Sequence, residues 1–217
     1  QEPRVMRTLF APALVAAAST LPRRAVLGGS ALILARTSMS AGQAAAADTN
    51  PDWPFKLGGP IVRGGEELMS QKAHGTTSTP VQKALRWNVE RDTADRICCF
   101  NRHYAEYAGY WRTTNFLAEV PRDKPMVYYD SVSGKPLFVA PIGRSVDDFL
   151  KESASHGWPS FRDQEVVWEN MRVLKDGESV SVDGTHLGHN LPDRNGNRYC
   201  INLVSVAGLP FDGKAEL

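Results

Sequence analysis

The segment Arg198-Tyr199-Cys200-Ile201-Asn202-Leu203 is the strongest indication of the fold that we expect for this chain. It opens a segment that continues to position 206 without Gly or Pro, which predicts a strand over 198–206. Alternate residues of a strand point to opposite faces. One face would carry the apolar side chains Tyr199, Ile201 and Leu203. The other would carry Arg198, Cys200 and Asn202, so that a thiol lies between a cation and an amide on a polar face.

Further strands are predicted upstream of this segment. The apolar runs at 126–129 and 137–140 flank a Ser-Gly-Lys turn, which indicates a β-hairpin. Two more strands are expected at 165–174 and 179–182, with an Asp-Gly turn between them. The periodicity therefore predicts a mainly β fold.

Two short helices are expected beside the strands. Apolar residues at i, i+4 spacing and the lack of Gly or Pro predict one helix over 81–95. A second helix is predicted to start after Ser145, which can cap it, with Asp148 in the first turn.

Composition limits the class of protein. The chain has 217 residues, of which 42% are hydrophobic and 23% charged, which is typical of a globular protein. A formal net charge of +1 gives no electrostatic argument for a nucleic-acid partner. There is no run of 18 apolar residues, so we expect no membrane-spanning helix. Three cysteines are too few for a disulfide scaffold.

The first 47 residues differ from the rest and are interpreted as a targeting segment. They contain five Arg and a single acidic residue, Glu2. The pair Arg23-Arg24 precedes an apolar run and an Ala-rich stretch, a pattern typical of twin-arginine export. We expect a plastid transit peptide followed by a thylakoid-lumen signal, with a mitochondrial presequence or bacterial periplasmic export as alternatives. Positions 48–92 are expected to be a linker or wrapping arm with one helix, and 93–217 to be the main domain.

Cys200 is the candidate nucleophile. A free thiol with a pKa of about 8.5 is only about 3% thiolate at neutral pH. A neighbouring guanidinium such as Arg198 favours the thiolate, and lowering the pKa by two units needs roughly 2.7 kcal/mol. The alternative is a small cysteine buried in a strand.

His186, His189 and Trp158 are the other candidate site residues. Two imidazoles three positions apart can donate protons near neutral pH, although structural histidines or zinc ligands together with Cys200 are alternatives. Trp158 precedes a Pro in a loop, where an exposed indole face can hold a methyl-sulfur group. The alternative for Trp158 is a core position.

These pieces occur in a familiar order. The chain reads GKPLF at 134–138, GWPSF at 157–161, HLGH at 186–189 and RYCIN at 198–202, and RHYAEYAGYW at 102–111 adds a further similarity. Together they resemble the B-type methionine sulfoxide reductases over roughly 93–207, in the branch that lacks structural zinc cysteines.

The resemblance implies a fold of two small antiparallel sheets packed face to face. It also implies thiol-dependent reduction of methionine-R-sulfoxide, free or in proteins, by a monomer without a bound cofactor or metal, which a thioredoxin-like donor regenerates. Cys200 would become a sulfenic acid, His186 and His189 would position water or a proton for the sulfoxide oxygen, and Asn202 would help to fix the site. Arg198 would favour the thiolate. Trp158 and Phe161 would contact the substrate.

The chain departs from this family at the resolving thiol. His156 stands where many members have a resolving cysteine. Cys98 or Cys99 could form a disulfide with Cys200 instead, or an external thiol could attack directly, or both residues could be inert. The residues after HLGH also differ from the usual pattern, which leaves a catalytically weakened binding module on the same scaffold as the alternative function.

Overall fold

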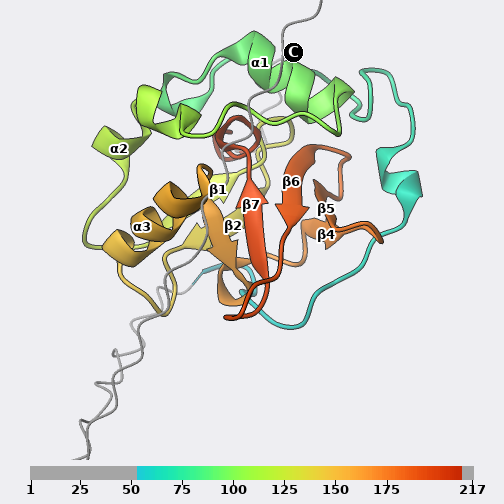
Figure 1. Ribbon diagram of the computed structural model, residues 1–217. Coiled ribbons are helices and arrows are strands. Elements are labelled where there is room, and N and C mark those ends of the chain that lie inside the picture. Colours follow the sequence, from blue (N-terminus) through green and yellow to red (C-terminus); the bar gives the residue numbers. More distant parts are fainter. Residues whose placement is uncertain (1–52, 212–217) are drawn as a thin grey trace, which may run out of the picture. The chain divides into compact units, whose positions relative to one another are not determined.

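Strand β7 (Arg198–Ile201), which contains the candidate nucleophile, is an inner strand of the larger of two sheets (Figure 1). The computed structural model describes residues 53–211. The larger sheet has five strands in the order β3-β7-β6-β5-β4, and each strand is antiparallel to the strands beside it. The other strands of this sheet are β3 (Ser160–Arg162), β4 (Met171–Val173), β5 (Glu178–Ser181) and β6 (His186–Asn190).

The smaller sheet is the predicted hairpin. Its strands β1 (Met126–Tyr129) and β2 (Pro136–Ala140) pair in antiparallel fashion, which confirms that prediction. Aromatic rings join the two sheets, because Phe161 of β3 stacks on Phe138 at 4.2 Å and meets Tyr128 edge-on at 4.9 Å between ring centroids. The structure is thus mainly β, with two antiparallel sheets and a few short helices, as expected.

Short helices surround the sheets. They are α1 (Arg91–Asp95), a π-helix that continues it (Arg96–Phe100), α2 (Phe116–Glu119) and α3 (Val146–His156). Single 3₁₀ turns occupy Glu66–Met69, Arg86–Asn88, Tyr110–Thr113, Asp163–Glu165 and Leu203–Ser205. The Oγ of Ser145 accepts a hydrogen bond from the Asp148 amide at 3.1 Å, so the predicted start of α3 is confirmed.

The prediction of one helix over 81–95 is wrong. Regular α-helix begins only at Arg91, after Trp87 and Asn88 adopt positive φ angles of 62° and 54°. This turn drives the Trp87 ring into the core, where it contacts Phe116 at 5.1 Å between centroids. The apolar spacing of the segment correctly predicts that Val81 and Val89 are buried. It does not show the backbone conformation, which is not helical at these residues.

Two predicted strands are shorter than expected. Only Met171–Val173 of the segment 165–174 is a strand, because the buried Glu165 carboxylate accepts a hydrogen bond from the Arg162 amide in a 3₁₀ turn. The last strand stops at Ile201 instead of 206. There the Glu106 carboxylate accepts the amides of Leu203 and Val204 at 2.6 and 3.0 Å, which replaces the sheet ladder by a 3₁₀ turn.

The described part of the predicted arm, 53–92, has little regular structure beyond two 3₁₀ turns and the start of α1. Gly64 donates a backbone hydrogen bond to the Val173 carbonyl, and the Val173 amide donates to Val62, both at 3.1 Å. The arm is therefore attached to the edge strand β4. Within residues 53–211, every helix is too short or too polar to span a membrane. The predicted targeting segment 1–47 lies outside the described residues.

Candidate functional site

A cavity of about 270 Å³ opens over the ends of β6 and β7. Its walls come from the segment His103–Ala105, from the loop before β3 and from the two strands. The residues that line it are His103, Tyr104, Ala105, Trp158, His186, Gly188, His189, Leu191, Cys200 and Asn202. Five of the residues singled out in the sequence thus surround one space.

The pairing of β6 with β7 brings the two histidines to the thiol. His189 is the register partner of Cys200, and Gly188 is the partner of Ile201. Gly188 has φ +150°, and a Cβ at this position would collide with the carbonyl oxygen of Cys200. The glycine between the histidines therefore allows the close approach of the strands.

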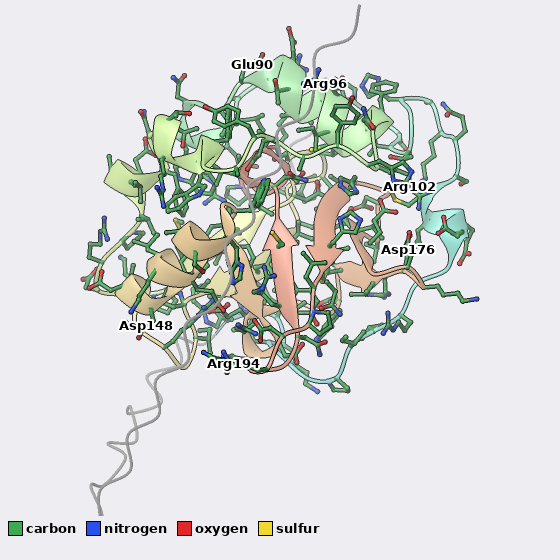
Figure 2. All side chains as sticks on the ribbon, viewed as in Figure 1. Glu90, Arg96, Arg102, Asp148, Asp176 and Arg194 are labelled. Atoms are coloured by element: carbon green, nitrogen blue, oxygen red, sulfur yellow. The ribbon has the colours of Figure 1, made fainter. Side chains whose placement is uncertain are left out.

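A chain of charged groups fixes His186. Its Nδ1 contacts Glu178 Oε1 at 2.7 Å, and the other oxygen of Glu178 accepts Arg102 Nε at 2.9 Å. Figure 2 labels Arg102 beside the upper end of β6. Both His186 and Glu178 are almost fully buried. Because Nδ1 is engaged, Nε2 is the ring nitrogen left for a ligand in the cavity.

His189 lies further out and is half-buried. Its ring meets that of His186 edge-on at 5.7 Å between centroids. Burial, assisted by the neighbouring His186, holds the pKa of His189 below its ordinary value. His189 is therefore a neutral imidazole at neutral pH.

The Cys200 thiol is partly exposed, and its surroundings favour the protonated thiol over the thiolate that the sequence predicts. Burial raises the pKa of Cys200, and the nearby Arg198 guanidinium lowers it by less than burial raises it. Arg198 is itself buried, and its Nε and Nη1 have no hydrogen-bond partner. The guanidinium thus opposes the effect of burial on Cys200, but the net shift of the pKa is in the opposite direction to the expected one.

The backbone of Glu106 forms hydrogen bonds with two residues of the cavity wall. Its amide donates to Asn202 Oδ1 at 3.3 Å, and its carbonyl accepts the Trp158 Nε1 proton at 3.0 Å. Asn202 also donates from Nδ2 to the Leu187 carbonyl at 3.2 Å. Trp158 is half-buried at the cavity wall. Its indole N–H is used in the hydrogen bond to Glu106, and its ring is available to a ligand.

Four predicted residues do not line the cavity, namely Arg198, Phe161, Cys98 and Cys99. Phe161 is fully buried between the two sheets, so the expectation that it contacts substrate is corrected to a core role. Cys98 is buried with its sulfur 3.5 Å from Ser205 Oγ, and Cys99 faces Asp95. Burial raises the pKa of both thiols, that of Cys99 to about 12, so neither is poised for attack. All three cysteines are free.

Several contributors escape prediction from the sequence. Glu178 is a lone carboxylate in an otherwise uncharged strand, and that isolation is the one signal that marks it. Tyr104 and Leu191 are exposed apolar residues at the cavity mouth, with no distinguishing pattern.

The described residues hold two clusters whose ligand atoms lie within 4.8 Å of one another, and neither includes the cavity histidines. The clusters are His74, Asp95 and Cys99, and Glu152, His156 and Asp193. The alternative of zinc on His186, His189 and Cys200 thus has no geometric support within residues 53–211. No known protein-family model matches this chain.

Proposed function

We propose that this protein reduces methionine-R-sulfoxide by thiol chemistry at Cys200, on a methionine sulfoxide reductase B-like scaffold. One observation carries the proposal. Trp158, His186, His189, Cys200 and Asn202 come from three separate sequence motifs, and all line the same cavity of about 270 Å³. An aromatic ring can hold the methyl group of a methyl sulfoxide, imidazoles can hold a water or a proton at its oxygen, and a thiol can attack its sulfur.

In the proposed reaction the Cys200 sulfur attacks the sulfoxide sulfur, an S–S bond forms, and the protonated sulfoxide oxygen leaves as water when the S–O bond breaks. A water molecule then attacks the Cys200 sulfur, the S–S bond breaks, and the thioether leaves as a proton is released. Cys200 ends as a sulfenic acid, so that the thiol is oxidised by two electrons and the sulfoxide is reduced by two. His186 Nε2 and His189 are the groups that can hold a water or a proton at the sulfoxide oxygen. The fixed Nδ1 contact with Glu178 keeps the His186 ring oriented for this step.

Recycling in this proposal uses an external dithiol such as a thioredoxin-like protein. Two thiols reduce the sulfenic acid to the Cys200 thiol and water, and they become a disulfide. Burial of Cys98 and Cys99 favours this route over an internal disulfide. Cys200 is partly exposed, which gives the donor access.

The test is an assay of turnover on the separate R and S epimers of N-acetylmethionine sulfoxide with dithiothreitol. The parent and the Cys98→Ser control are expected to reduce only the R epimer, and Cys200→Ser is expected to reduce neither. Activity that survives Cys200→Ser would remove the catalytic proposal, as would a parent that turns over neither epimer.

The raised pKa of Cys200 favours a second candidate function, a binding module on the same scaffold that has lost turnover. In that case the R epimer binds, as calorimetry would measure, without chemical change. Replacing Trp158 by Ala would then weaken binding, and replacing Cys200 by Ser would not.

A further inference from the structure

A second group of ligand-type side chains lies where the arm meets the end of α1 and the π-helix. Asp95 ends α1 and Cys99 lies one turn later in the π-helix, so the carboxylate and the thiol project from one helical face. His74 belongs to the arm and reaches the same face from a tight turn. Three residues with nitrogen, oxygen and sulfur donors thus converge from two segments of the chain.

The donor atoms are separated by distances suited to a common ion. His74 Nε2 lies 3.0 and 2.9 Å from the two oxygens of Asp95, and Cys99 Sγ lies 3.8 Å from Oδ1. Neighbouring ligands of a tetrahedral zinc with bonds of about 2.0–2.3 Å are about 3.3–3.8 Å apart. The histidine and the carboxylate need to separate by only roughly 0.4 Å to admit the ion.

The backbone fixes the position of His74. Thr76 donates to the Cys99 carbonyl twice, from its amide at 2.8 Å and from Oγ1 at 3.2 Å. Gly75 has φ +66° and lies so close that a Cβ would collide with the same carbonyl oxygen. The turn is therefore held directly against the residue that supplies the sulfur, and the site does not depend on a flexible side chain to assemble.

We propose that His74, Asp95 and Cys99 bind one Zn²⁺, with the fourth position open to water. A neutral imidazole, a carboxylate and a thiolate balance the charge of a divalent ion, which suits a site in which Cys99 is fully buried. Binding displaces the Cys99 proton to solvent, because only the thiolate ligates. His74 and Asp95 are about a quarter exposed, at 28% and 21%, and leave an entry path.

The charge around the two clusters distinguishes them. In the cluster of Glu152, His156 and Asp193, the guanidinium of Arg162 pairs with both carboxylates. Within residues 53–211 the only ion-pair partner of Asp95 is His74. A metal ion at the Asp95 cluster therefore does not have to displace a permanent cation.

The site is independent of the chemistry proposed at Cys200. A zinc ion there would join the arm to the π-helix, which leads directly into the cavity wall at His103–Ala105. It would also commit Cys99 to ligation and remove it as a resolving thiol.

The proposal is tested by titrating the full chain with Zn²⁺ and measuring the heat of binding by calorimetry. The absorption spectrum of the Co²⁺-loaded protein shows whether a thiolate is a ligand. One ion per chain should bind. The substitutions His74→Ala and Cys99→Ser should each weaken binding by more than about 100-fold, since loss of a direct ligand exceeds the 10–100-fold cost of outer contacts. The matched controls Cys98→Ser and Cys200→Ser should bind as the parent does.

His74→Ala removes a partly exposed side chain, so it reports on the site even where Cys99→Ser impairs folding. Absence of binding in the folded parent would overturn the proposal. Equal binding by His74→Ala, or loss of binding in Cys200→Ser, would overturn it as well.

Discussion

Glu106→Gln is expected to change how stability depends on pH. Burial raises the pKa of Glu106 from its ordinary value of 4.5 to about 7, in spite of the two amides that its carboxylate accepts. The folded protein therefore holds this proton more tightly than the unfolded chain does. The stability from this group is complete below pH 4.5 and is lost as the pH rises through about 7.

The size of the effect follows from the two pKa values. Each pKa unit is worth about 1.4 kcal/mol, so the loss between about pH 4 and 8 is about 3 kcal/mol. Glutamine keeps one oxygen for the amides and does not titrate. The difference in free energy of unfolding, parent minus Glu106→Gln, should fall by about 3 kcal/mol over this range.

Urea denaturation at a series of pH values, followed by tryptophan fluorescence, measures this difference. Taking the difference cancels the titration of groups that both proteins share, His189 among them. Glu169→Gln is the matched control, because Glu169 is exposed, and its curve should parallel that of the parent. A Glu106→Gln curve that also parallels the parent would refute the reasoning.

Three further changes follow from the cavity. Glu178→Gln leaves fewer hydrogen-bond acceptors for His186 and Arg102, so urea denaturation should show a loss of about 1.5–3 kcal/mol in the free energy of unfolding. An unchanged midpoint would contradict a stabilising role for the contacts of Glu178 with these two residues. Arg198→Met removes the cation that lowers the pKa of Cys200, so the midpoint of the pH dependence of iodoacetamide alkylation should rise; an unmoved midpoint would exclude that electrostatic role. Gly188→Ala introduces a Cβ that collides with the Cys200 carbonyl and should lower Tm, and a normal Tm would contradict the close strand approach.

Local patterns were sufficient to predict elements that are stabilised by near neighbours. The hairpin of β1 and β2 and the start of α3 at Ser145 belong to this group. The HLGH and RYCIN segments lie in adjacent strands, and their register places His189 opposite Cys200.

Features that depend on distant residues were not predictable in this way. The spacing over 81–95 predicts burial correctly, but it cannot distinguish a helix from a left-handed turn that inserts Trp87 into the core. Strand alternation places Arg198 beside Cys200, yet it does not report how deeply the thiol is buried, and burial dominates its pKa. Glu106 meets the end of β7 across nearly 100 residues of sequence, which no local pattern encodes.

The most direct measurement is the state of Cys200 after one turnover without reductant. The protein is mixed with one epimer of N-acetylmethionine sulfoxide, treated with dimedone and mapped by mass spectrometry. The proposed chemistry predicts a dimedone adduct on Cys200 with the R epimer and none with the S epimer. An unmodified Cys200 after exposure to the R epimer, with the sulfoxide recovered intact, would contradict it.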